Sequence, residues 1–334
     1  PKMSMHEGVR KMKNMTYAEA LRSAIRSEMQ KDSKVFMAGE DISVMGGSFG
    51  VSAGLFDEFG PERIINCPIS ETAIIGMGVG AAAAGMRPIV ELMYLDFAGC
   101  AMDEIMNQAA KMRYMFGGKC RLPMVIRAAG GATVRAAAQH SQMIEGMFTH
   151  IPGLKVACPS NPADAKGLLL EAIEDDNPVM FIEHKALYSM KGEVPEEMER
   201  VPFGRAAVLK EGTDITLIAW SYMAGVALEA AEKLEAQGIH AEVIDARTLV
   251  PFDRDTLFDS VRKTHRLAII SEAVKTSGFA SEIAAMVSEE CLDELDENII
   301  RITAPDCPVP YSGVLEDAYV PDSDVITERV KRLF

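Results

Sequence analysis

Aromatic residues are scarce in this chain: they make up 6% of its 334 residues, and only one is tryptophan. No window approaches the roughly 20 consecutive apolar residues that a membrane-spanning helix needs. Basic residues are also in deficit, with 34 Lys and Arg against 49 Asp and Glu. The resulting net charge of -15 argues against nucleic acid or an anionic membrane as the main partner. We therefore predict a soluble, cytoplasmic protein.

Several familiar motifs are missing as well. None of the six cysteines forms a C-x-x-C pair or a zinc-finger spacing with a histidine, so we interpret them as reduced thiols in a reducing compartment. There is no G-x-S-x-G motif and no P-loop. The glycines at 76, 78 and 80 do not complete a dinucleotide-binding fingerprint, because position 81 is alanine and the run is helical. These small residues favour close helix packing instead.

Short apolar strands alternate with helices along most of the chain. Thr16 and Glu19 have the spacing of a capping box, which predicts a helix over residues 17–31. Continuous apolar strands separated by helices are typical of a parallel sheet that is covered on both faces. The expected strands are at 35–38, 64–65, 88–93, 123–128, 154–157, 179–183, 214–219, 241–244, 267–270 and 299–303. The longer helices between them are expected at 70–85, 96–115, 141–150, 161–174, 223–237, 253–263, 281–295 and 323–333.

The alternation is interrupted once, near the middle of the chain. Pro195, Pro202 and a run of acidic residues predict a linker over residues 191–204. Two tandem α/β domains follow from this, at residues 15–190 and 205–334. Residues 1–14 are basic and methionine-rich without an apolar stretch, and they predict a disordered lead rather than a secretory signal.

Three places could carry chemistry. Glu71 begins a helix after a strand, at the sheet edge where open α/β sheets bind ligands, although an acid there also complements the helix dipole. His140 follows a Gly- and Ala-rich loop and could be either an active-site or a structural histidine. The helix end at residues 172–177 offers free carbonyl oxygens, which either hold a hard cation or remain solvated.

A series of short motifs, in a fixed order, resembles one family. The sequence from about Met15 to the C-terminus is similar to the beta subunits of the thiamine diphosphate-dependent 2-oxo acid dehydrogenase components. The motifs are PISE at 68–71, ELM at 91–93, AQHSQ at 138–142, PGLKV at 152–156, DAKGL at 164–168, PVPY at 308–311 and LED at 315–317. Loop and helix segments at 96–100, 107–111, 113–119, 183–185 and 187–197 are most similar to acetoin dehydrogenase beta subunits.

The resemblance implies a transketolase-like pyrimidine-binding domain followed by a transketolase C-terminal domain. It implies that Glu71 hydrogen-bonds the aminopyrimidine ring of the cofactor and that Met93 and Phe97 pack beside that ring. It implies that His140 serves proton transfer or steers the substrate and the lipoyl group. It also implies a potassium site, built largely from backbone carbonyls, at Met124, Ala172, Ile173, Asp175 and Asn177.

One absence has a consequence for the assembly that the resemblance implies. The family holds the cofactor's diphosphate and its Mg²⁺ through a Gly-Asp-Gly motif, and this sequence has none. An alpha subunit would supply it, in an α2β2 heterotetramer that is active only with both chains. The expected reaction is cleavage of acetoin with transfer of the acetyl unit to the lipoyl carrier of an acyltransferase core. Pyruvate or a branched 2-oxo acid is the alternative substrate, and a non-catalytic scaffold subunit is the alternative of another class.

Overall fold

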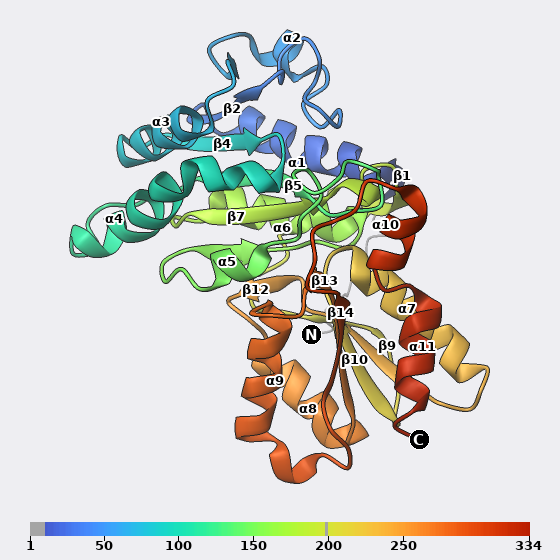
Figure 1. Ribbon diagram of the computed structural model, residues 1–334. Helices are drawn as coiled ribbons and strands as arrows, with labels where there is room; N and C mark the ends of the chain where they lie inside the picture. The colour runs from blue at the N-terminus through green and yellow to red at the C-terminus, as the bar shows by residue number, and fades with distance from the viewer. Residues whose placement is uncertain (1–10, 198–199) are drawn as a thin grey trace, which may run out of the picture.

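The computed structural model describes residues 11–197 and 200–334, which form two largely parallel β-sheets with helices on both faces of each (Figure 1). The predicted α/β fold with two tandem domains is confirmed. The first sheet has the order β12-β6-β7-β5-β4-β2-β3. Its strands are β12 (Thr248–Val250), β6 (Lys155–Ala157), β7 (Val179–His184), β5 (Val125–Gly130), β4 (Arg87–Leu92), β2 (Val35–Glu40) and β3 (Ile64–Cys67).

Alternating side chains of this sheet enter two different cores. Val35 and Met37 of β2 pack on one face with the helices α1 (Tyr17–Lys31) and α6 (Pro162–Glu174). Phe36 and Ala38 point to the other face, which carries α3 and the helical segments that follow β4. These are α3 (Glu71–Ala83), the 3₁₀-helix η1 (Leu95–Ala101), the π-helix η2 (Glu104–Ala109) and α4 (Ala110–Met115). The shorter helices of this domain are α2 (Leu55–Phe59), α5 (Glu145–Thr149) and η3 (Lys185–Leu187).

The second sheet has the order β14-β13-β10-β11-β9. In Figure 1, α7 and α11 lie on one side of it and α8 and α9 on the other. Its strands are β14 (Ile300–Ala304), β13 (Leu267–Val274), β10 (Ile215–Ala219), β11 (Ala241–Asp245) and β9 (Ala207–Lys210). Its helices are α7 (Tyr222–Glu235), α8 (Arg254–Thr264), α9 (Phe279–Glu290), η4 (Leu292–Glu294), α10 (Gly313–Tyr319) and α11 (Ser323–Lys331). No helix within the described ranges is long and apolar enough to cross a membrane.

Local sequence signals fix some of these elements and not others. The capping box at the start of α1 is confirmed, since the Glu19 amide donates to Thr16 Oγ1 and the Thr16 amide donates to the Glu19 carboxylate. Such a cap stabilises a helix by about 1 kcal/mol. Ser70 precedes α3 as predicted, but its hydroxyl donates to the Pro68 carbonyl instead of capping the helix.

Two predicted helices have a different form. The segment expected as one helix over 96–115 divides into η1, η2 and α4, so its winding changes twice. The helix expected over 141–150 is only α5, because residues before Glu145 belong to the loop that packs against η1. In both places tertiary contacts override the local propensity for a regular helix.

The expected lead and linker contain regular structure. The strand β1 (Met12–Thr16) pairs antiparallel with β8 (Lys191–Pro195), so the part of the lead from Met12 to Asn14 is a strand rather than disordered. Residues 1–10 of that lead lie outside the described part of the chain. The pairing was missed because its two strands are far apart in the sequence, and neither has a strong apolar alternation.

Candidate active site

The candidate site lies at one edge of the first sheet. The chain passes from β2 to β3 on one side and then crosses to β4 on the other side, so the strand order reverses between β2 and β4. Open α/β sheets bind ligands outside the carboxyl ends of their strands at such a reversal. The segments that leave these strands carry Glu40, Glu71 and Met93. Two carboxyl groups and one thioether therefore lie at the position where this architecture binds ligands.

Two carboxyl groups lie at this edge. Glu71 is the first residue of α3 and is half-buried, while Glu40 ends β2 and is only 6% exposed. Burial raises the pKa of Glu40, and the charge of Glu71 raises it further, whereas a hydrogen bond from the Ser70 backbone opposes the rise. The Glu40 carboxyl group therefore keeps its proton to a higher pH than an exposed glutamate does. Sequence reasoning missed Glu40, although an acid directly after a buried strand was a signal for it.

An aromatic cluster forms the other part of the site. The His140 ring lies edge-on to Phe97, with 5.2 Å between ring centroids, and edge-on to Tyr94 at 4.8 Å. Tyr94 and Phe97 themselves are in edge contact at 5.7 Å. The structure therefore brings together Phe97 and His140, two of the predicted residues. Tyr94 was not predicted, although it directly follows Met93.

Hydrogen bonds connect the segments that carry these residues. Thr72, next to Glu71, donates from its hydroxyl to the carbonyl of Cys100 at 2.6 Å, which joins the start of α3 to η1. Asp96 in η1 accepts from the backbone and side-chain amides of Gln142, at 3.2 and 2.8 Å. The helix of Glu71, the 3₁₀-helix of Phe97 and the segment of His140 are thus held against one another.

A buried ion trio lies under Met93. Arg127 donates to Glu183 at 2.7 Å and to Glu91 at 2.5 Å, and the Tyr188 hydroxyl donates to Glu183 at 2.7 Å. Burial alone would lower the pKa of Arg127, but the charges of Glu183 and Glu91 outweigh this effect and raise it. The hollow beside Met93 and Tyr188 holds only about 10 Å³. The trio fills the interior beside Met93, and no ligand fits into the volume that remains.

The residues predicted for potassium lie around the end of α6. Met124 precedes β5, Ala172 and Ile173 end α6, and Asp175 and Asn177 follow it. The carbonyls of Ile173 and Asp175 accept from the Arg87 guanidinium at 3.0 and 3.2 Å, and the Asn177 side chain accepts from Arg113 at 2.7 Å. Oxygen atoms do gather at this helix end. The sequence did not point to the guanidinium groups of Arg87, Arg113 and Arg121 or to the Lys155 ammonium group on Asp175, and these already bring positive charge there.

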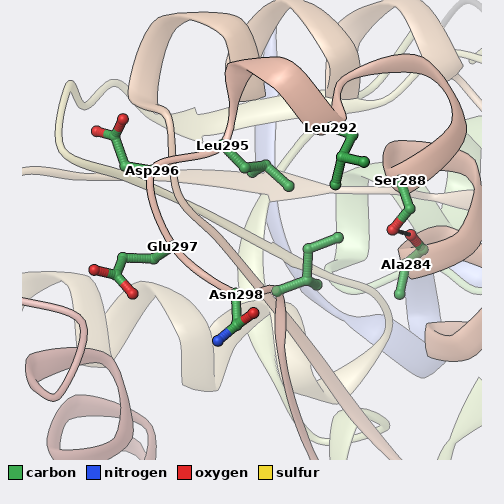
Figure 2. Close-up of a pocket in the computed structure, with 8 residues that line it drawn as sticks. Ala284, Ser288, Leu292, Leu295, Asp296, Glu297 and Asn298 are labelled. Carbon is green, nitrogen blue, oxygen red and sulfur yellow. Dashed lines mark hydrogen bonds between the residues drawn. The ribbon is translucent and has the colours of Figure 1, made fainter.

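Figure 2 shows a surface hollow of about 450 Å³ far from this edge. It lies beside the turn that follows α9, at the opposite end of the molecule from α3 in Figure 1. Leu292 and Leu295 line it together with Asp296 and Glu297. None of the predicted site residues lines this hollow, so it does not belong to the candidate site.

Two family profiles together match most of the chain. The profile of "Transketolase, pyrimidine binding domain" matches residues 13–191, and that of "Transketolase, C-terminal domain" matches residues 204–326. A solved structure described as "Split gene transketolase, inactive beta4 tetramer" has a TM-score of 0.79 at 25% identity. That similarity covers 95% of this chain and 97% of the solved one.

Curated relatives are similar over nearly their full length. The "Acetoin:2,6-dichlorophenolindophenol oxidoreductase subunit beta" of Bacillus subtilis (strain 168) is 49% identical, over 93% of this chain and 95% of the relative. The "Pyruvate dehydrogenase E1 component subunit beta" of Rickettsia felis is 44% identical, over 96% and 98%. The "2-oxoisovalerate dehydrogenase subunit beta" of B. subtilis is 42% identical, over 96% and 99%. The chain therefore belongs to the beta subunits of the thiamine diphosphate-dependent 2-oxo acid dehydrogenase component family.

Proposed function

We propose that this chain is the beta subunit of an acetoin dehydrogenase component, which cleaves acetoin and transfers the acetyl unit to a lipoyl carrier. The observation that carries the catalytic part is the contact of His140 with Phe97, whose 3₁₀-helix is hydrogen-bonded to the start of the helix of Glu71. The preference for acetoin rests on the 49% identity to the B. subtilis acetoin oxidoreductase subunit, against 44% and 42% for the pyruvate and 2-oxoisovalerate relatives. Pyruvate is the second candidate substrate for the same machinery.

The edge residues fit the aminopyrimidine ring of thiamine diphosphate. A half-buried carboxyl group at Glu71 can hydrogen-bond a ring nitrogen, and the buried Glu40 beside it has a raised pKa. Met93 and Phe97 are half-buried and offer apolar surface to a flat heterocycle. When bound, the cofactor supplies a nucleophilic carbon. In this proposal Glu71 holds the proton that the ring exchanges, and Phe97 fixes the ring's position.

His140 is suited to proton transfer with the substrate. Its ring is half-buried and is held edge-on by Tyr94 and Phe97. Among the described residues, none forms a hydrogen bond with either ring nitrogen of His140. Both nitrogens can therefore form a hydrogen bond with a substrate hydroxyl or a lipoyl sulfur, as a general acid or base must do.

The remaining parts of the machinery are proposed to come from other chains. The sequence has no Gly-Asp-Gly motif, which supports an alpha subunit that holds the diphosphate and Mg²⁺ in an α2β2 assembly. A lipoyl acyltransferase core would receive the acetyl unit. We further propose that potassium binds at the end of α6, where the carbonyls of Ile173 and Asp175 converge. The six free thiols support a cytoplasmic location.

The test is a reconstitution of this chain with its alpha subunit. Turnover of acetoin, pyruvate and 3-methyl-2-oxobutanoate is compared with an artificial electron acceptor. Acetoin should have the highest kcat/KM, and a preference for pyruvate would replace the substrate assignment while leaving the site intact.

The role of Glu71 has its own test in the same complex. Glu71→Ala should lower kcat by at least about 100-fold, because it removes the group that exchanges the ring proton. Glu282→Ala is the matched control, since Glu282 is also an acid in the first turn of a helix. If Glu71 only complements the helix dipole, as a scaffold subunit would require, the two variants would have the same small effect.

A further inference from the structure

We propose that the C-terminal domain positions His140 through the loop of residues 131–140, which we call the histidine loop, and that Arg135, Glu316 and Lys185 are positioning residues for it. This inference rests on the proposed function of His140. It assigns a part in the reaction to a domain that contributes none of the predicted site residues.

The backbone of the histidine loop adopts a conformation that its own residues disfavour. Gly131, Thr133, Arg135 and Ala137 all have positive φ angles, of 90°, 76°, 62° and 62°. Residues with a Cβ rarely adopt this left-handed region, so the conformation is unfavourable at Thr133, Arg135 and Ala137. Contacts from the surrounding structure must therefore hold the loop in place.

Glu316 of α10 supplies the strongest of these contacts. Its side chain is fully buried, and it accepts from the Arg135 backbone amide at 3.1 Å and from the Arg135 guanidinium at 2.5 Å. The same guanidinium donates to Asp317, whose side chain is 66% exposed. Gly313 allows this approach, because a Cβ at that position would lie 3.0 Å from Arg135 Nε. Figure 1 shows α10 at the boundary between the two domains.

A second acid of the C-terminal domain holds the start of the loop. Glu272 of β13 accepts from the Ala132 backbone amide at 2.6 Å, and its other oxygen lies 2.6 Å from His184 Nε2. Gly131 lies against the same histidine, since a Cβ on it would be 2.0 Å from His184 Nε2. The C-terminal domain thus contacts the loop through the buried carboxylates of Glu272 and Glu316, and both accept hydrogen bonds from backbone amides of the loop.

The end of the loop is held by the first domain. Lys185 is 5% exposed, donates from its ammonium group to the His140 carbonyl, and lies 5.5 Å over the Tyr94 ring. Tyr94 is the same ring that contacts the His140 imidazole. The C-terminal domain therefore sets where the loop begins, and Lys185 sets where it ends, so a displacement at Arg135 moves the imidazole relative to Phe97.

Three variants test this arrangement in the full chain and in the complex with the alpha subunit. Arg135→Met removes a partly exposed group, which keeps the risk of misfolding low, and Glu316→Gln keeps the shape of the buried side chain. Arg135→Lys restores one charge without the paired geometry. Lys233→Met is the control, because Lys233 also pairs with an acid of the C-terminal domain and its side chain is equally exposed, 43% against 42% for Arg135.

Two readouts are needed. Hydrogen exchange of residues 131–140 in the full chain alone should become faster in Arg135→Met and Glu316→Gln, but not in Lys233→Met. In the complex, kcat should fall about 10- to 100-fold with little change in the KM for acetoin, because a small misplacement of a catalytic group has an effect of that size. Arg135→Lys should recover part of the loss.

The decisive comparison is a double-mutant cycle with His140→Ala. If Arg135 acts through His140, Arg135→Met should add no further loss of kcat once the imidazole is gone. An equal loss in both backgrounds would overturn the inference, and so would unchanged hydrogen exchange of the loop. If His140→Ala itself leaves turnover unchanged, the proposed role of His140 is wrong. If His140→Ala lowers turnover but Arg135→Met does not, His140 is catalytic and only the positioning role of Arg135 is wrong.

Discussion

The two parallel sheets of this chain have the same kind of strand-order reversal but use it differently. In the first sheet the reversal between β2 and β4 carries Glu40, Glu71 and Met93 near the aromatic cluster. In the second sheet the reversal lies between β10 and β13, where Trp220 and Glu272 are found. Trp220 donates to Glu145 of the first domain, and Glu272 accepts from the Ala132 amide of that domain. The first edge is proposed to bind the cofactor ring, whereas the second is covered by protein. The reversal in strand order creates a possible binding edge in both sheets. The residues at each edge determine whether it faces a ligand or packs against the neighbouring domain.

Displacing His184, which links the first edge to Glu272 of the second, should have the largest effect. Gly131→Ala would place a methyl group 2.0 Å from His184 Nε2 at a φ of 90°. We expect a loss of about 3 kcal/mol or more in the free energy of unfolding, from backbone strain and steric overlap together. Gly238→Ala is the control, because its φ is 81° but nothing lies within 4 Å, so only the backbone cost of about 1 kcal/mol remains. Chemical denaturation measures both, and equal losses would show that the contact with His184 has no weight.

The covered edge should be sensitive to pH. Burial raises the pKa of Glu145 to about 7, and the hydrogen bonds from Trp220 and Ser271 oppose the rise only in part. The folded chain retains a proton there that the unfolded chain releases at lower pH, so stability should fall as the pH rises from about 4.5 through 7. Glu145→Gln removes this titration and should be more stable than the wild type at pH 8, by about 3 kcal/mol.

The same measurement has a clear control and a clear failure. Glu289→Gln changes an exposed acid of α9 and should leave the dependence on pH unchanged. Thermal unfolding of all three proteins between pH 5 and pH 8 would contradict the assignment if Glu145→Gln and the wild type lost stability in parallel.

A smaller effect is expected at the open edge. Glu40→Gln removes a buried carboxyl group whose pKa is raised, so the acid limb of the pH profile of kcat/KM should lose that group's contribution and move to lower pH. The change in kcat/KM near neutral pH should be about tenfold or less, because Glu40 acts on Glu71 at a distance from the substrate. Asp57→Asn is the control, since Asp57 is an exposed acid of α2 and does not contribute to the raised pKa of Glu40. Identical profiles for Glu40→Gln and the wild type would remove Glu40 from the site.

The smallest effect concerns neither edge. If potassium binds at the end of α6, replacing KCl by choline chloride should lower Tm by a few degrees, in proportion to the logarithm of the ion concentration. Arg87→Met should make this dependence steeper, because Arg87 now bonds the carbonyls of Ile173 and Asp175. A Tm that is independent of potassium in both proteins would mean that the basic side chains around this helix end satisfy its oxygen atoms without the ion.

The sequence predicted those features that depend on neighbouring residues. The cap at Thr16, the start of α3 at Glu71 and most strands follow from local patterns, and their positions are confirmed. The contact between Phe97 and His140 joins distant segments, and only the resemblance to a family suggested that both belong to one site.

What the sequence missed depends on long-range pairing. Tyr94 lies in no motif that marks it, and the partners of Arg135 lie in another domain. The π-helix at Glu104–Ala109 and the short strands β1 and β8 likewise arise from packing, which overrides weak local preferences. Residue patterns therefore predict where elements begin more readily than which side chains meet.

The short strand β12 connects the two halves of the chain more firmly than a linker would. Thr248–Val250 follows a strand of the second sheet, yet it pairs antiparallel with β6 at the edge of the first. Trp220 and Phe279 pack in the same apolar core as Phe148, so the two sheets share buried side chains as well. Pulling the halves apart would strip a strand from one sheet and open a common interior. A calorimetric scan of this chain should therefore contain a single cooperative melting transition, with neither half retaining its structure after the other is lost.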